Sequence, residues 1–181
     1  MAHTIEPAAS GRSKCRGCGK PIAKEELRFG ERLPNPFADG EMTIWFHLQC
    51  AALKRPESFN ELLQEETLQA LMPDIEVKES LVRSIEFGLE HRRVERINGV
   101  EKATSGRARC RSCRQVISKG QWRIPLAFFE EGMFNASGFV HVACTAQYFE
   151  TTDILPYLEH FTDELQLEDL EELQKTLDSS S

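Results

Sequence analysis

The chain has 181 residues, six cysteines and a formal net charge of −7. It contains no run of about 18 apolar residues and no basic N-terminal stretch followed by an apolar one, so we expect neither a membrane-spanning helix nor a secretory signal. An intracellular protein is therefore predicted. In a reducing compartment, cysteines in Cys-x-x-Cys spacing are more often metal ligands than disulfide partners.

Positive charge gathers around the cysteines. Residues 1–55 carry a net charge of +3 and residues 101–149 a net charge of +4. The acidic residues are concentrated elsewhere, because residues 56–100 carry −5 and residues 150–181 carry −9. The acidic average therefore conceals two basic segments that would suit a polyanionic partner.

Two segments of the chain repeat one another at an offset of 95 residues. The sequence from Ser10 to Cys18, SGRSKCRGC, aligns with the sequence from Ser105 to Cys113, SGRARCRSC. Each segment is followed by a His-x-x-Cys pair, after 28 residues in the first repeat and 27 in the second. The repetition predicts two tandem small α+β modules, at residues 1–95 and 96–181.

Short antiparallel strands are predicted between the two ligand pairs of each module. Strand-forming residues occupy 27–33 and 43–46 in the first module, and 121–129 and 139–141 in the second. Turn signals separate the strands within each pair. These signals are Pro34-Asn35-Pro36 and Asp39-Gly40 in the first module, and Glu131-Gly132 and Ser137-Gly138 in the second.

Helices are predicted after each His-x-x-Cys pair. Ser58 followed by Glu61 is typical of a capping box, and the helix that it opens would end at Pro73. Apolar residues recur with helical spacing over 81–89, and again at 170, 173 and 177 within the acidic C-terminal stretch. Core packing is the expected role of these leucines.

Each module supplies three thiolates and one imidazole, a donor set that structural zinc prefers. The two sets are Cys15, Cys18, His47, Cys50 and Cys110, Cys113, His141, Cys144, which use all six cysteines. A thioredoxin-like redox pair is an alternative, but no βαβ pattern surrounds either Cys-x-x-Cys. A catalytic zinc is a second alternative, but such sites usually keep one position open. We therefore expect two structural Zn²⁺ ions per chain.

The motifs resemble the zinc finger of the poly(ADP-ribose) polymerase (PARP) type, which also occurs in a eukaryotic DNA ligase. The resemblance rests on Ser-Gly-Arg before Cys-x-x-Cys, on Leu27-Arg28, on the Asp39-Gly40 loop and on Trp45-Phe46-His47 before the last cysteine. It covers both repeats and leaves too few residues for a catalytic domain. The expectation is therefore a pair of fingers that is not itself an enzyme.

The resemblance implies that the fingers bind DNA breaks, nicks and ends by structure rather than by base sequence. In the family, the arginines of Ser-Gly-Arg and Leu-Arg grip phosphates, and an aromatic loop residue stacks on the exposed base pair at a break. The implied phosphate-gripping residues are Arg12, Arg28, Arg107 and Arg123. The stacking candidates are Phe37 in the first finger and Phe128, Phe129, Met133 and Phe134 in the second, of which Met133 and Phe134 lie nearer the turn.

Further basic residues cluster around the ligands, as phosphate contacts would. They are Lys14, Arg16, Arg109, Arg111 and Arg114. We therefore predict a DNA-repair accessory protein that senses strand breaks, located at the nucleoid of a bacterium or in the nucleus of a eukaryote. The alternative is a zinc-stabilised adaptor that binds a protein partner through its acidic helical surface, and a repair-protein partner of the fingers would bind there too.

Overall fold

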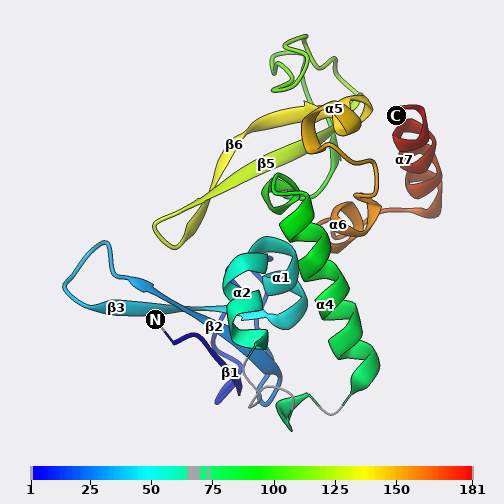
Figure 1. The fold of residues 1–181 in the computed structure, drawn as a ribbon. Helices are drawn as coiled ribbons and strands as arrows, with labels where there is room; N and C mark the ends of the chain where they lie inside the picture. Colours follow the sequence, from blue (N-terminus) through cyan, green and yellow to red (C-terminus); the bar gives the residue numbers. More distant parts are fainter. Residues whose placement is uncertain (1, 65–69, 73, 181) are drawn as a thin grey trace. The chain divides into compact units, whose positions relative to one another are not determined.

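The computed structural model describes residues 2–64, 70–72 and 74–180 (Figure 1). The chain folds into two compact units. The first unit comprises Met1–Glu90 and Phe129–Phe134, and the second comprises His91–Phe128 and Asn135–Ser181. A division into modules at residue 95 remains a prediction. Within the described residues, no helix combines the length and the apolar character that crossing a membrane requires.

The first unit contains a three-stranded antiparallel sheet with the order β1-β2-β3. Its strands are β1 (Thr4–Pro7), β2 (Leu27–Pro34) and β3 (Glu41–His47). The two predicted strands of this module are confirmed as β2 and β3. β1 is not evident from the sequence, because four residues that end in proline form too short an alternating pattern to indicate a strand.

The helices α1 (Leu48–Lys54), α2 (Pro56–Leu63) and α4 (Ile75–Glu90) follow the sheet in the first unit. The predicted capping box is wrong, because α2 begins at Pro56 and places Ser58 inside the helix. Proline suits the first position of a helix, where its missing N–H has no intrahelical partner. The predicted end at Pro73 lies outside the described residues.

Three phenylalanines form the centre of the first unit. Phe29 of β2 lies 5.0 Å from Phe59 of α2 and 6.2 Å from Phe46 of β3, measured between ring centroids. All three side chains are fully buried. Leu81 and Ile85 of α4 are also buried, which confirms the predicted apolar face of that helix. The core therefore joins the sheet to the helices that follow it.

A second three-stranded sheet has the order β4-β5-β6, and all of its residues except those in 129–134 belong to the second unit. Its strands are β4 (Glu101–Lys102), β5 (Trp122–Glu130) and β6 (Met133–His141). Glu131-Gly132 forms the predicted turn, and both residues have positive φ angles. The prediction of a second turn at Ser137-Gly138 is wrong, because both residues lie within β6. Gly138 has a φ of 89° there, so the glycine bends the strand instead of ending it.

The helical elements of the second unit are η1 (Val94–Arg96), η2 (Val142–Cys144), α5 (Thr145–Phe149), α6 (Leu155–His160) and α7 (Leu167–Ser179). Leu173 and Leu177 of α7 are buried, as their spacing predicts. A capping box between Gln166 and Asp169 begins this helix. The predicted C-terminal helix is therefore confirmed, with its apolar side packed and its acidic side exposed.

A buried carboxylate connects β2 to the helices of the first unit. The Glu31 side chain is fully buried, and its Oε1 accepts a hydrogen bond from Arg55 Nη2 at 2.7 Å. Arg55 Nε donates to Oε2 at 2.9 Å, and Ser58 Oγ donates to Oε1 at 2.6 Å. The carboxylate is thus held by a two-point guanidinium contact and a hydroxyl, which is the arrangement that a buried charge requires.

We expect Glu31→Gln to lower the free energy of unfolding of the first unit by about 2 to 3 kcal/mol, because it leaves the Arg55 guanidinium without its counter-charge. The matched control is Glu79→Gln, which removes an exposed carboxylate from an i,i+4 pair with Arg83. That change should cost about 0.5 kcal/mol or less. Amide hydrogen exchange over β2 and α2 of the zinc-loaded protein measures both, and equal effects would contradict the assignment.

Candidate metal centres and nucleic-acid interface

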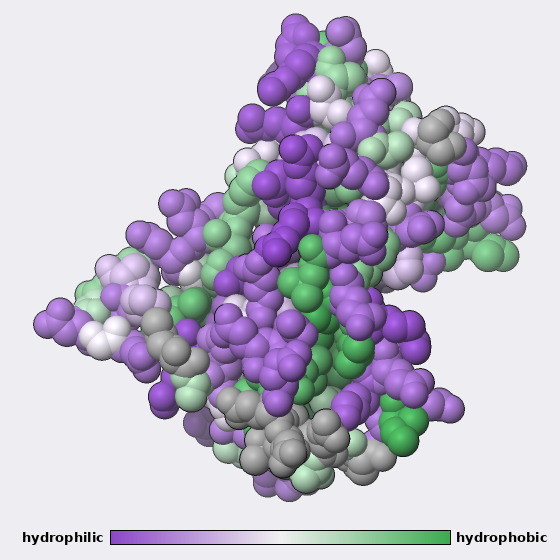
Figure 2. Space-filling view, viewed as in Figure 1, coloured by the Kyte–Doolittle hydropathy of each residue, from purple (hydrophilic) through white to green (hydrophobic). Residues whose placement is uncertain are grey.

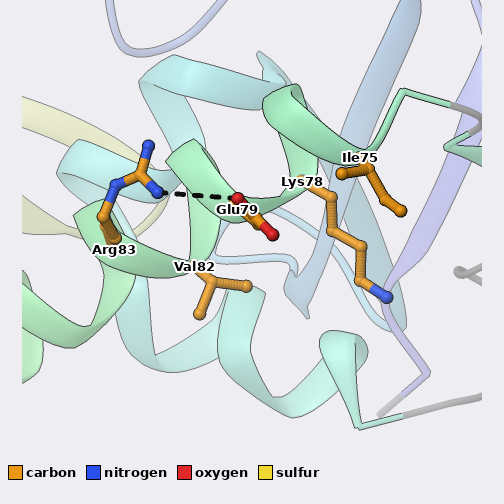
Figure 3. A pocket seen from close by; sticks show the side chains of 5 residues that line it. All are labelled: Ile75, Lys78, Glu79, Val82 and Arg83. Atoms are coloured by element: carbon orange, nitrogen blue, oxygen red, sulfur yellow. Dashed lines mark ion pairs between the residues drawn. The ribbon is translucent and has the colours of Figure 1, made fainter.

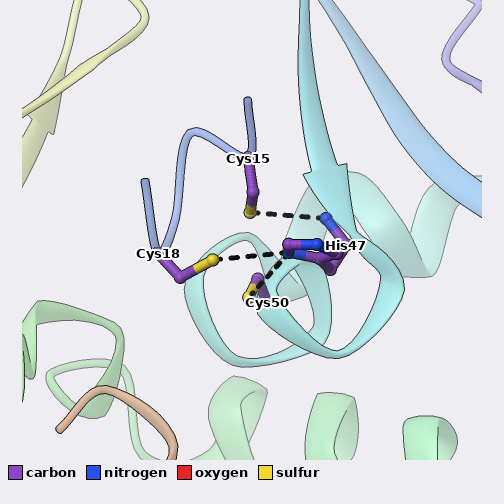
Figure 4. Close-up of side chains that lie close together, drawn as sticks. All are labelled: Cys15, Cys18, His47 and Cys50. Carbon is purple, nitrogen blue, oxygen red and sulfur yellow. Dashed lines mark hydrogen bonds between the residues drawn. The ribbon is translucent and has the colours of Figure 1, made fainter. Parts of the chain in front are cut away.

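The four predicted ligands of the first module converge on one point (Figure 4). Cys15 and Cys18 lie on the turn before β2, His47 ends β3, and Cys50 lies in the first turn of α1. Their ligand atoms all lie within 4.8 Å of one another. His47 Nδ1 is 3.4 Å from Cys18 Sγ and 3.9 Å from Cys50 Sγ, so this ring nitrogen faces the thiols.

The second module reproduces the same arrangement with Cys110, Cys113, His141 and Cys144. His141 Nδ1 is 3.4 Å from Cys113 Sγ and 3.9 Å from Cys144 Sγ, the same two distances as in the first module. His141 ends β6, and Cys144 lies in η2. The structure therefore brings together every metal ligand that the sequence predicts.

Backbone amides orient the buried sulfur of each site. His47 N donates to Cys15 Sγ at 3.3 Å, and His141 N donates to Cys110 Sγ at the same distance. Ser112 N also donates to Cys110 Sγ, at 3.4 Å. Amide donors of this kind stabilise a thiolate, which is the form of cysteine that binds a metal.

The thiols of each site cannot all ionise without a compensating cation. Hydrogen bonding from Cys50 lowers the pKa of Cys15 to about 5, and the same hydrogen bond raises the pKa of Cys50. Burial is the main cause that raises the pKa of Cys144 to about 12, and the negative charge of the neighbouring thiolates adds to it. A divalent cation bound by the sulfurs compensates their negative charge, so that all three thiols of a site can be ionised. Three sulfurs and one imidazole nitrogen around a single point fit Zn²⁺, and four protein ligands leave no position open for a substrate.

Comparison with known proteins agrees with this geometry. Residues 6–81 match the family described as "Poly(ADP-ribose) polymerase and DNA-Ligase Zn-finger region". The chain belongs to the PARP-type zinc-finger family. The predicted resemblance is confirmed, and the two Cys3His groups of these fingers are structural zinc sites.

Several poly(ADP-ribose) polymerases are similar to both fingers together. The chain is 31% identical to Poly [ADP-ribose] polymerase 1 of Oryza sativa subsp. japonica over 161 residues, which cover 86% of this chain and 16% of the relative. It is 30% identical to Poly [ADP-ribose] polymerase of Sarcophaga peregrina over 164 residues, which cover 79% of this chain and 16% of the relative. The chain thus spans about a sixth of the length of these relatives.

The basic residues predicted to contact phosphates fall into two groups. The first group is exposed and consists of Arg12, Lys14, Arg16, Arg107, Arg109, Arg111 and Arg114. The second group is Arg28 and Arg123, which are only 8% and 7% exposed. The sequence alone did not separate these two groups, because both lie in equally basic surroundings.

Arg28 and Arg123 occupy equivalent positions, and each is held in the same way. The Arg28 guanidinium lies 3.6 Å from the centroid of the Trp45 ring, and its Nη2 donates to Glu6 at 2.7 Å. The Arg123 guanidinium lies 3.7 Å from the Phe139 ring, and its Nη2 donates to Glu101 at 2.7 Å. The pairing of these arginines with Glu6 and Glu101 is not evident from the sequence, because each carboxylate lies 22 residues before its arginine in the chain.

The predicted stacking residues differ in exposure. Phe37 is 82% exposed and Met133 is 47% exposed, whereas Phe134 is half-buried. Phe134 lies 4.9 Å from Phe129 between ring centroids. Phe128 is 38% exposed on β5. Phe37 and Met133 are therefore the most accessible of these apolar side chains.

We expect the purified protein to contain two zinc ions per chain and each of the variants Cys50→Ser and Cys144→Ser to contain one, because each substitution removes one ligand from a closed site. Elemental analysis measures the ratio. The control is His160→Ala, which removes a histidine outside both clusters and should leave two ions bound. Two ions in either cysteine variant would contradict the ligand assignment.

Zinc binding should also release protons. Because the pKa values of Cys50 and Cys144 are raised, the metal-free protein holds protons on these thiols at neutral pH. Zinc displaces them, so zinc affinity should rise with pH and fall as the solution is acidified. Calorimetric titration in two buffers of different ionisation enthalpy measures the proton release, and identical heats in both buffers would rule it out.

Proposed function

We propose that the two fingers bind DNA and recognise strand breaks, nicks and ends by their structure. The main support is the repetition of exposed basic residues at the same positions around both zinc sites, where Arg12, Lys14 and Arg16 correspond to Arg107, Arg109 and Arg111. Three thiolates and one Zn²⁺ leave a charge of −1, which a single cation would offset. Three exposed cations per site exceed that need and suit phosphate contacts.

The two buried arginines would contact phosphates in a different way from the exposed ones. Glu6 and Glu101 already neutralise one edge of the guanidinium groups of Arg28 and Arg123. Arg28 Nε is buried and has no hydrogen-bond partner within the described residues. Only a narrow edge of each group would remain for DNA. We therefore assign the larger share of the salt-dependent affinity to Arg12, Arg107 and their exposed neighbours.

Stacking would select the broken substrate. The loop between β2 and β3 presents Phe37, whose amide donates to Asn35 Oδ1 at 2.9 Å and so orders the turn that carries the ring. In the second finger, Met133 and Phe134 begin β6 directly after the turn. Apolar side chains in these positions can cover an exposed base-pair face, which exists at a break and not within continuous duplex.

DNA repair is the setting that we propose for this binding, because the similar proteins are poly(ADP-ribose) polymerases and the family description names DNA ligase. The protein would be intracellular and associated with DNA. In this proposal the fingers recognise DNA breaks and catalyse no reaction, because four protein ligands occupy every coordination position of each metal site.

The adaptor alternative rests on helix surfaces. A pocket of about 320 Å³ on α4 is lined by Ile75, Lys78, Glu79, Val82 and Arg83 (Figure 3). Ile75 is 70% exposed, and Figure 2 shows hydrophobic surface over α4. A protein partner would bury these apolar groups, and such binding should depend little on salt, whereas DNA binding weakens steeply with salt.

The double substitution Arg12→Ala, Arg107→Ala should weaken DNA binding while both zinc ions stay bound. Each lost phosphate contact should reduce the slope of log K against log salt by about one unit, so the double variant should lose about two. The matched control, Arg83→Ala with Lys175→Ala, removes the same charge from α4 and α7. Unchanged affinity and slope in the first variant would favour the adaptor alternative.

Phe37→Ala and Phe134→Ala should each lower affinity for nicked and blunt-ended DNA more than for intact duplex. A stacking contact contributes about 1 to 3 kcal/mol, and it is absent from continuous duplex. Binding to intact, nicked, gapped and blunt-ended DNA of one sequence measures the preference. If the folded, zinc-loaded variants keep the original order of preference, these two rings do not stack, and Met133→Ala becomes the next variant to measure.

A further inference from the structure

The second unit contains a cavity of about 200 Å³ whose lining includes none of the zinc ligands. It is lined by Arg111, Arg114, Leu126, Phe128, Ser137 and Tyr148. Arg111, Arg114 and Phe128 are exposed, so the cavity opens to solvent. Its walls thus combine two guanidinium groups, two aromatic rings and the hydroxyl groups of Ser137 and Tyr148.

The glycine inside β6 makes room for one of these guanidinium groups. A Cβ atom at Gly138 would lie 2.7 Å from Arg111 Nε, so the arginine side chain packs directly against the bare backbone. In the first finger the position that corresponds to Gly138 is Ile44, which is only 2% exposed. The equivalent surface of the first finger is therefore filled by an aliphatic side chain.

Two other positions that line the cavity also differ between the fingers. Leu126 corresponds to Glu31, whose buried carboxylate is already bound by Arg55 and Ser58. Tyr148 corresponds to Lys54, which is buried. Among the described residues, the combination of guanidinium groups without a carboxylate partner and aromatic rings therefore occurs only at this position of the second finger. Both fingers nevertheless have the same zinc site and the same sheet order.

Two further arginines hold the aromatic wall in place. The Arg96 guanidinium lies 4.5 Å from the centroid of the Phe128 ring, and its Nη1 donates to Tyr148 Oη at 3.1 Å. The Arg93 guanidinium lies 5.3 Å from the centroid of the Tyr148 ring, and its Nη1 donates to the Tyr148 carbonyl at 3.0 Å. Both rings are thus positioned before any ligand arrives.

These four arginines carry positive charge with no acidic counterpart. Among residues 2–64, 70–72 and 74–180, no carboxylate forms an ion pair with Arg93, Arg96, Arg111 or Arg114. Guanidinium groups suit phosphate oxygens in charge and in geometry. A phosphomonoester carries a charge of about −1.5 to −2 near neutral pH, whereas each internal phosphate of DNA carries −1. The array therefore favours a terminal phosphate.

We propose that this cavity binds the terminal nucleotide of a DNA strand that ends in a phosphomonoester. The phosphate lies on Arg111 and Arg114, and the sugar or base lies against Phe128 and Tyr148. A volume of about 200 Å³ is smaller than the roughly 300 to 1,000 Å³ of sites for drug-sized ligands, so it accepts one end of a strand and not a duplex. The inference rests on the proposed binding of broken DNA and adds the chemistry of the end.

The test compares nicked DNA of one sequence whose nick carries a 5′-phosphate, a 3′-phosphate or hydroxyl groups only, with intact duplex as reference. The zinc-loaded protein should bind one of the phosphorylated nicks about tenfold more tightly than the hydroxyl nick, as expected for charge-assisted hydrogen bonds. The phosphorylated nick that binds with the higher affinity shows whether the cavity accepts a 5′-phosphate or a 3′-phosphate.

Arg111→Gln with Arg114→Gln should lower the affinity for every one of these DNAs, because Arg111 is also among the proposed phosphate contacts, and should in addition abolish the preference for the phosphorylated nick over the hydroxyl nick. The control, Lys119→Gln with Lys175→Gln, removes the same charge from the second unit outside the cavity and should keep that preference. Because Arg111 and Arg114 adjoin zinc ligands, Phe128→Leu provides an independent variant of the aromatic wall, and it should reduce the phosphate preference with two zinc ions still bound.

Three outcomes would overturn the inference, and only one of them also overturns the function on which it rests. If the unmodified protein prefers nicked to intact DNA but binds phosphorylated and hydroxyl nicks equally, the cavity assignment is overturned and the proposed function stands. If it binds all four DNAs equally, the proposed function is overturned and the inference falls with it. If the Lys119→Gln, Lys175→Gln control loses the phosphate preference as fully as the arginine variant, general charge explains it and the cavity does not.

Discussion

The closed Cys3His site is the constraint on which the rest of each finger depends. His47 ends a strand and Cys50 lies in the helix that follows, so a metal bound by both fixes the strand to the helix and draws in the Cys-x-x-Cys turn. Structural zinc in finger peptides contributes about 10 to 16 kcal/mol of apparent binding energy near neutral pH. The metal is therefore a large stabilising contribution to each finger.

The two fingers have the same zinc site, but the residues that pack beside it differ in charge and size. In the first finger, Glu31 and Arg55 place a satisfied ion pair against an aromatic core. In the second finger, the uncharged Leu126 stands at the position of Glu31, and Gly138 leaves room for Arg111 to lie against β6. Duplication thus kept the positions that hold the metal, because any loss there opens the site. The positions beside it were left to diverge in charge and shape.

Arg28 and Arg123 show how the proposed DNA surface is ordered. Each guanidinium is fixed by a ring on one side and a carboxylate at one edge, through Trp45 and Glu6 or through Phe139 and Glu101. These contacts restrict long side chains that would otherwise lose conformational entropy on binding. The other cations around the zinc sites are exposed to solvent, so the buried, ordered guanidinium groups and the accessible cations are two different sets of residues.

The sequence by itself determined the duplication, all eight metal ligands, the paired strands and the packed face of the C-terminal helix. These features follow from fixed ligand spacing and from periodic apolar residues, which are local signals. Only the tertiary structure decided that β1 and β4 complete the sheets, that Ser137 and Gly138 lie inside β6, and that Arg28 and Arg123 are buried. It also decided that Arg93 and Arg96, from an acidic stretch of sequence, lie on the rings of Tyr148 and Phe128. Pairing partners, burial and neighbouring charges depend on residues that are far apart in the chain, and the pattern of any one segment does not carry them.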